Sequence, residues 1–255
     1  MEQESVRGFY DSLAADYHLL YPDWDASISR QGRALDWLIC QFAGQGPLRV
    51  LDCACGIGTQ ALALAQRGHS VLGTDLSPLA AGRALAEAKA RDVQLPVAVA
   101  DMRRLPFRAA AFDVVVCADN SISHLLSALD VQSALEQMHS VLKPGGLLVL
   151  TKRPDKVRER HPTSTPVQVT HTPAGRVLSF QLWTWHRDGE RYDMEHIQLH
   201  PQGDTWTTRV RRTTSWAMTT RQVEDFAVAA GFTEAAWHDP QRSGFFQPVL
   251  TATAQ

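Results

Sequence analysis

The residues best suited to chemistry are an acid and two glycines that follow a short apolar segment. Asp52 ends the apolar run from residue 48 to 51, and Gly56 and Gly58 come shortly after it. Glycine adopts positive φ and lets backbone approach a ligand closely, while the N–H groups at the start of the next helix attract anionic oxygens. This turn therefore predicts a binding site for a ligand with carboxylate or phosphate oxygens.

A second acid has the spacing expected of a ribose ligand. Asp75 ends the apolar run from residue 70, close to the offset of about 20 residues at which an acidic side chain binds ribose hydroxyls. The structural alternative is a helix N-cap, but Ser77, before Pro78, is better placed for that role. Asp75 is thus the candidate ribose ligand.

Two cosubstrates contain such a ribose, a nicotinamide dinucleotide and S-adenosylmethionine. The dinucleotide needs a third glycine, which residues 59–66 lack, and Asp52 would repel its pyrophosphate but suit the ammonium group of a methionine moiety. Asp101 and Met102 follow an apolar segment at 97–100. They offer an acceptor for an adenine amine and a soft side chain beside the ring. These features favour S-adenosylmethionine.

The elements that would position these residues form two kinds of pattern. Strand-like and helical segments alternate from residue 48 to 153, including a strand at 112–117 and a turn at 142–146 before a strand at 147–151, which predicts repeated βαβ units. Beyond residue 153, segments rich in β-branched and aromatic residues are separated by turn residues and predict antiparallel hairpins. These predicted strands are 167–170, 176–186, 192–200 and 205–215. A helix at 220–230 then ends at Gly231.

We expect one domain with a lid in this chain of 255 residues, 44% of which are hydrophobic. The predicted division has a helical lid segment at 1–47, a cosubstrate-binding α/β core at 48–153, an antiparallel β lid at 154–218, and a C-terminal helix and strands at 219–255 that complete the sheet.

Composition excludes several classes of partner. The net charge of −2 argues against nucleic acid. The acidic N-terminus and the absence of an apolar run near 18 residues argue against a membrane or a signal peptide and predict a cytoplasmic protein. The four cysteines are expected to be buried thiols, and the ten histidines show no metal-ligand spacing, so no metal is predicted.

The order of these motifs resembles that of the class I S-adenosylmethionine-dependent methyltransferases. The motifs are 50–58, Asp75, 101–102, 112–115 and 142–146; the segments 9–19, 119–125 and 243–248 further resemble glycine and glycine/sarcosine N-methyltransferases. The likeness spans nearly the whole chain. It implies a doubly wound, mostly parallel seven-stranded sheet with helices on both faces, and a last antiparallel strand at about 244–252.

Two polar residues follow core strands and are candidates for binding the acceptor. Asn120 follows the strand that ends near Cys117, where its side-chain carbonyl would accept a hydrogen bond from an amine; the alternative is a turn residue bonded to its own backbone. Arg153 follows the strand at 147–151 and would meet a carboxylate with its planar fork. The resemblance implies the same two roles.

The other candidate site residues belong to the loops and to the N-terminal segment. His124 comes four residues after Asn120 and would accept a proton or pack against the loop. Tyr10 belongs to an aromatic segment that would either pack in the core or cover a sulfonium. The resemblance implies that Arg30 reaches the methionine carboxylate. The cosubstrate contacts expected in all are Tyr17, Arg30, Asp52, Ala54, Gly56, Gly58, Asp75, Leu76, Asp101, Met102 and Ala118.

The sequence therefore predicts an enzyme that methylates the nitrogen of a small amine and releases S-adenosylhomocysteine. Methyl transfer is an in-line displacement that needs orientation rather than a strong acid or base. Pro154 and Phe246 replace residues usual in the glycine methyltransferases, which also allows a larger amine. The alternatives are methylation of a hydroxyl or carboxylate oxygen, a noncatalytic S-adenosylmethionine-binding protein, and a nicotinamide oxidoreductase.

Overall fold

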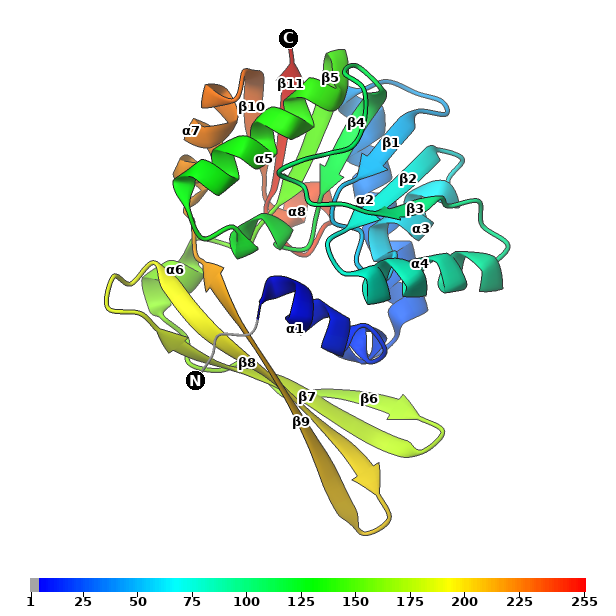
Figure 1. Cartoon of the computed structure of the whole chain (residues 1–255), viewed down its shortest axis with the longest axis vertical. Coiled ribbons are helices and arrows are strands. Elements are labelled where there is room, and N and C mark those ends of the chain that lie inside the picture. Colours follow the sequence, from blue (N-terminus) through cyan, green and yellow to red (C-terminus); the bar gives the residue numbers. More distant parts are fainter. Residues whose placement is uncertain (1–4) are drawn as a thin grey trace.

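The computed structural model describes residues 5–255, which form a seven-stranded sheet and a separate four-stranded sheet (Figure 1). The larger sheet has the order β10-β11-β5-β4-β1-β2-β3, and β11 alone runs antiparallel to its neighbours. Its strands are β1 (Arg49–Asp52), β2 (Ser70–Asp75), β3 (Val97–Val99), β4 (Phe112–Cys117), β5 (Leu142–Thr151), β10 (Phe232–His238) and β11 (Val249–Ala254). The predicted mostly parallel, seven-stranded sheet is confirmed.

Helices cover both faces of this sheet because successive strand residues point to opposite sides. Val50, Val114 and Val116 pack against α2 (Trp24–Phe42), α3 (Thr59–Ala65) and α4 (Pro78–Ala90). Leu51 and Val115 pack on the other face, against α5 (Ala128–Val141) and α7 (Thr220–Ala229). The two apolar layers give the doubly wound arrangement that the sequence predicts.

The smaller sheet is an antiparallel meander between β5 and α7. Its strands are β6 (Gln168–Thr172), β7 (Gly175–Trp185), β8 (Arg191–Gln202) and β9 (Thr205–Trp216), paired in chain order. The predicted hairpins are confirmed, with strand ends displaced by a few residues. The short helix α6 (Lys156–Arg160) leads into the meander.

The helix α1 (Val6–Leu13) lies between the two sheets (Figure 1). Its buried Phe9 and Leu13 pack against Trp183, Tyr192 and Met194 of the meander. The Asp11 carboxylate accepts a hydrogen bond of 2.6 Å from the Ser77 hydroxyl at the start of α4. Helix α1 thus lies between much of the meander and the core, while Trp216 at the end of β9 packs directly into the core.

Two predicted boundaries are wrong. The last strand begins at Val249 rather than near residue 244, because α8 (Pro240–Ser243) ends at Gly244 with φ 71° and a bend follows. The predicted turn at 142–146 lies within β5. Leu142 pairs with Phe112 and Leu147 with Val114, so the intervening residues bulge out of the ladder.

All four cysteines were expected to be buried thiols. All four are free thiols, and three are buried, but Cys40 is only half-buried. Within residues 5–255, no helix is both long and apolar enough to span a membrane. The same residues contain no cluster of His, Cys, Asp and Glu that could hold a metal ion.

Candidate active site

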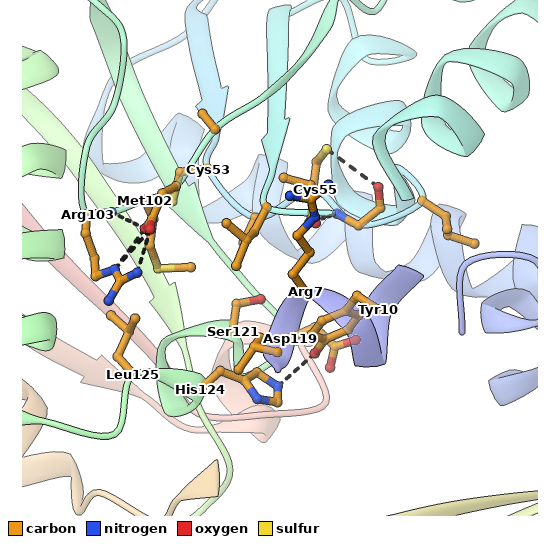
Figure 2. Close-up of a pocket in the computed structure, with 18 of the residues that line it drawn as sticks. Arg7, Tyr10, Cys53, Cys55, Met102, Arg103, Asp119, Ser121, His124 and Leu125 are labelled. Atoms are coloured by element: carbon orange, nitrogen blue, oxygen red, sulfur yellow. Dashed lines mark hydrogen bonds and ion pairs between the residues drawn. The ribbon is translucent and has the colours of Figure 1, made fainter. Parts of the chain in front are cut away.

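A cavity of about 390 Å³ opens where β1, β2, β3 and β4 end, with α1 on its other side. We define its β2–β3 end by Asp75, Asp101, Met102 and Arg103. We define its α1 end by Tyr10, Tyr17, Asp119 and His124. Figure 2 shows Arg103 and Met102 together at one side of the cavity, and Tyr10, His124 and Asp119 gathered at another.

The glycine turn between β1 and α3 forms the floor of the cavity. Gly56 has φ 54°, and a Cβ atom added to it would meet no protein atom within 4 Å. Gly58, with φ 97°, is the N-cap of α3, and Thr59 and Gln60 of its first turn line the cavity. The open space beside Gly56 and the N–H groups at the start of α3 suit a ligand with oxygen atoms.

Asp75 joins this turn to the start of α4. Its Oδ2 accepts a hydrogen bond of 2.8 Å from the Gly56 N–H, and its Oδ1 accepts one of 2.8 Å from the Ser77 N–H. Ser77 itself is the N-cap of α4, because its hydroxyl accepts from the Ala80 N–H. Burial raises the pKa of the Asp75 carboxyl, which lines the cavity.

Asp52 lies beneath the glycine turn and does not line the cavity. Its side chain has no exposed surface, and its Oδ2 has no hydrogen-bond partner among the described residues. Burial raises the pKa of this carboxyl to about 7. The structure therefore does not place Asp52 where it could contact the ammonium group of a ligand in the cavity.

Asp101 and Met102 line the β2–β3 end, but Asp101 is already paired. Both of its oxygens accept hydrogen bonds from the Arg103 guanidinium, at 2.7 to 3.1 Å, and these bonds lower the pKa of the carboxyl. Arg103 also contacts Asp130 at 2.6 Å. The sequence did not single out Arg103, since an arginine beside an acid is common on protein surfaces.

Tyr10 of α1 and His124 form a hydrogen-bonded pair at the α1 end. The Tyr10 hydroxyl lies 2.8 Å from His124 Nε2, across 114 positions of sequence. His124 belongs to the short helix η2 (Ser121–His124). Burial lowers the pKa of His124 to about 4 and raises the pKa of the Tyr10 phenol well above its ordinary value. Both rings are therefore neutral near pH 7.

Asp119 lies beside this pair, two residues beyond the end of β4. Its Oδ2 accepts hydrogen bonds from the hydroxyls of Tyr17, at 3.2 Å, and Tyr21, at 3.1 Å. Its Oδ1 accepts a longer one, of 3.4 Å, from the Gln247 amide. Burial raises the pKa of this carboxyl. Sequence reasoning missed Asp119, although its position after a central strand was a usable signal.

Asn120 and Arg153 are brought together, but in a small crevice of about 10 Å³ lined by other residues than the main cavity. The Asn120 side-chain carbonyl accepts from the Ser123 hydroxyl and from the Arg153 backbone N–H, both at 2.9 Å. Asn120 has φ 66°, a conformation that asparagine tolerates. Its predicted acceptor oxygen thus braces the loop.

The Arg153 side chain points toward the meander. Its guanidinium carbon lies 4.6 Å from the Trp183 ring centroid, and its Nη2 donates to Gln181 at 3.4 Å. Its Nε has no hydrogen-bond partner among the described residues. Trp183 and Tyr192 stack within the meander.

The remaining predicted contacts divide into two groups. Tyr17, Ala54 and Leu76 line the cavity. Arg30 is exposed on α2 and donates to the Ser27 hydroxyl at 3.1 Å, so it does not reach the cavity in this conformation. Gly58 and the buried Ala118 also lie outside the cavity lining.

Comparison with known proteins finds a match for the region around the glycine turn. Residues 50–146 match the sequence model of a family described as "Methyltransferase domain". A glycine/sarcosine N-methyltransferase of Parasynechococcus marenigrum is 36% identical over 132 residues, which cover 51% of this chain and 46% of the relative. A demethylmenaquinone methyltransferase of Thermus thermophilus is 33% identical over 149 residues, covering 57% of this chain and 64% of the relative.

Solved structures are similar over nearly the whole chain. The CcbJ methyltransferase from Streptomyces caelestis superposes with a TM-score of 0.79 at 20% identity and covers 99% of both chains. CalS10, an amino pentose methyltransferase from Micromonospora echinaspora, gives 0.75 at 23% identity, covering 94% of this chain and 95% of its own. These likenesses show the fold, whereas the chain spans only about half the length of the glycine/sarcosine relatives it matches.

Proposed function

Given that residues 50–146 form a class I S-adenosylmethionine-dependent methyltransferase domain, we propose that this protein transfers a methyl group to the nitrogen of a small amine. The observation that carries the proposal is the single cavity shared by the β2–β3 end and the α1 end. Its volume, about 390 Å³, lies near the lower limit for ligand pockets and suits one cosubstrate and a small acceptor.

The residues of the β2–β3 end fit S-adenosylmethionine, whose sulfonium supplies the methyl group. In this assignment the N–H groups at the start of α3 meet the methionine carboxylate, and Asp75 accepts from the ribose hydroxyls. Asp75 already faces the cavity beside the open space at Gly56. Met102 lies beside the adenine ring, and Asp101 accepts from its amine while remaining paired with Arg103.

The residues of the α1 end orient the acceptor and exclude water. Positioning of two reactants can supply about 7–11 kcal/mol of the barrier, so neutral groups are sufficient for this reaction. The Tyr10–His124 pair provides a fixed, uncharged hydrogen-bonding wall. Helix α1 separates the cavity from the meander and closes it on that side.

An amine acceptor is supported by two sets of similar proteins. The sequence relatives include glycine/sarcosine N-methyltransferases, and the structural neighbours include an amino pentose methyltransferase and a sugar N-methyltransferase, KedS8 from Streptoalloteichus. Amino acids and amino sugars are therefore the acceptor classes we favour.

The demethylmenaquinone methyltransferase relatives provide a second candidate, methylation of a quinone precursor. Methylation of an oxygen atom is a third. Both differ from the favoured function in the acceptor atom and use the same cosubstrate.

The experiment that tests this function measures release of S-adenosylhomocysteine with a panel of acceptors. The panel contains glycine, sarcosine, dimethylglycine, an amino sugar, hydroxy acids and demethylmenaquinone. We expect release with at least one primary or secondary amine. Release only with hydroxy acids or the quinone would contradict N-methylation, and binding of S-adenosylmethionine without any release would favour a noncatalytic protein.

A further inference from the structure

The acids that line the cavity differ in what neutralises them. Asp101 and Asp130 share the Arg103 guanidinium, at 2.7 Å and 2.6 Å. Asp75 accepts two backbone N–H groups at the start of α4 and in the glycine turn. Asp119 is bonded only by the neutral donors Tyr17, Tyr21 and Gln247.

No Lys, Arg or His among residues 5–255 forms an ion pair with Asp119. Arg153 is near enough for its charge to lower the pKa of the carboxyl, but burial has the larger, opposite effect. A carboxylate in low dielectric without a cationic partner is electrostatically incomplete. A positive charge in the adjoining cavity would complete it.

The orientation of the Asp119 carboxylate is fixed. Two tyrosine hydroxyls hold Oδ2, whereas Oδ1 accepts only the 3.4 Å bond from Gln247, so Oδ1 has an acceptor site to spare. The residue also has φ 53°, uncommon for a side chain other than glycine. Backbone conformations of this kind persist where the surroundings hold them and cluster at functional sites.

From this geometry we propose that Asp119 makes the site select an amine nitrogen, by accepting its N–H and stabilising the positive charge that methylation places on it. The inference rests on the proposed function and names the residue that determines the acceptor atom. Asp119 is then the one charge at the α1 end that no cation neutralises, and it lies beside the neutral Tyr10–His124 pair.

The charge movement in the reaction matches this role. The nitrogen lone pair forms the new N–C bond as the S–C bond breaks, and the electrons of that bond stay on sulfur as a neutral thioether. The positive charge therefore moves from sulfur to nitrogen, where Asp119 Oδ1 accepts the N–H. A preorganised group of opposite charge at the atom that becomes charged lowers the barrier.

The same carboxylate disfavours acceptors that react as anions. A hydroxyl must lose its proton to become a strong nucleophile, and a quinol-type carbon acceptor reacts through its oxyanion form. Either anion would lie beside the negative Asp119 in a low-dielectric site, where like charges repel strongly. An amine reacts as a neutral molecule and avoids this repulsion.

The test compares Asp119→Asn with the wild-type protein and with Asp113→Asn. Asn has the same shape, lacks the charge and tolerates positive φ. Asp113 lies near the start of β4, the strand that Asp119 follows, and forms an ion pair with Lys143 outside the cavity. Asp119→Gly is a second variant whose backbone suits the φ of 53°. Circular dichroism and thermal unfolding confirm that each variant is folded.

Two quantities are measured: kcat/KM for the amine that wild-type turns over, and the dissociation constants of S-adenosylmethionine and S-adenosylhomocysteine by calorimetry. Loss of one preorganised electrostatic group predicts that Asp119→Asn lowers kcat/KM about 100-fold. The ratio of the two dissociation constants should remain that of the wild-type protein. Asp113→Asn should change neither.

A selective loss of S-adenosylmethionine affinity would overturn the inference, since Asp119 would then be the partner of the sulfonium. Unchanged kcat/KM with the amine would also overturn it, and the proposed function would stand. If wild-type itself methylates only oxygen or carbon acceptors, the proposed function fails together with the inference.

Discussion

The two ends of the cavity are built from the chain in opposite ways. The β2–β3 end uses residues at successive strand ends, and its longest-range side-chain hydrogen bond, Arg103 to Asp130, joins positions 27 apart. The α1 end joins Tyr10 to His124 across 114 positions and Gln247 to Asp119 across 128. One end is local in sequence, and the other exists only when distant segments meet.

The ends also differ in charge. At the β2–β3 end, the acids are paired with Arg103 or with backbone N–H groups. At the α1 end, two neutral rings adjoin one carboxylate that has no ion pair among the described residues. A site that binds a constant cosubstrate can be rigid and self-neutralised, whereas acceptor selection depends on the few groups left uncompensated.

The largest effect is expected from Asp75→Ala. The change removes the acceptor of the Gly56 and Ser77 N–H groups and the proposed ribose contact. Hydrogen bonds to charged groups contribute about 1.5–3 kcal/mol. The dissociation constant of S-adenosylmethionine, measured by calorimetry, should therefore rise roughly 10- to 150-fold. Asp225→Ala, on the exposed face of α7, is the control. Equal affinity of Asp75→Ala and wild-type would remove the assigned role of the β2–β3 end.

Acid should remove the contribution that neutral His124 makes to stability. The pKa of His124 is about 4 in the fold and 6.5 in the unfolded chain, so the unfolded state binds more protons between these values. Its contribution to stability is present above pH 6.5 and is lost as the pH falls toward 4. The loss on reaching pH 4 is about 3 kcal/mol in the free energy of unfolding. His196 in the meander, with a pKa also near 4, adds a similar slope.

Denaturant titrations at pH 7.5, 6 and 5 measure this slope, and His124→Gln should make it smaller. Asp101 at the β2–β3 end stays ionised over this range because Arg103 lowers its pKa. A slope unchanged by His124→Gln would show that the ring is not held neutral by its surroundings.

A smaller effect is expected from Tyr10→Phe, which removes the hydrogen bond to His124 and keeps the ring. One such bond contributes about 1 kcal/mol, so kcat for an amine acceptor should fall roughly fivefold. Steady-state kinetics and calorimetry separate this effect from binding, because the dissociation constant of S-adenosylmethionine should not change. A higher dissociation constant of S-adenosylmethionine with an unchanged kcat would show instead that Tyr10 contributes to cosubstrate binding.

The smallest effect is expected from Arg103→Ala. Its ion pairs are partly exposed, and such pairs contribute at most about 1 kcal/mol and are screened by salt. The dissociation constant of S-adenosylmethionine should rise by about fivefold or less, and less still in high salt. A loss as large as that of Asp75→Ala would mean that Arg103 contacts the cosubstrate directly.

The sequence predicts the fold and, except for Arg103, the residues of the β2–β3 end, because both depend on local patterns. Apolar strands followed by Gly56, Asp75 or Asp101 identify the edge of the sheet where ligands bind. The hairpins of the meander follow from turn residues between aromatic and β-branched segments.

The α1 end could not be predicted in this way, since no spacing rule connects Tyr10 with His124 or Tyr21 with Asp119. Asn120 and Arg153 were correctly expected to follow core strands, but their side chains turn away from the cavity lining. The backbone N–H of Arg153 donates a hydrogen bond to the Asn120 side-chain carbonyl. The residue types alone do not reveal this bond.

The position of α1 between the two sheets has a consequence for synthesis. Ser12 accepts a hydrogen bond from Arg211, which lies 199 positions later. At about 5–20 residues per second, the ribosome needs roughly 10–40 s to produce that partner. Phe9 and Leu13 have no meander to pack against until β7 and β8 have been synthesised. The nascent chain therefore leaves these two apolar side chains without their partners for most of this interval, and the α1 end is complete only after Gln247 is added.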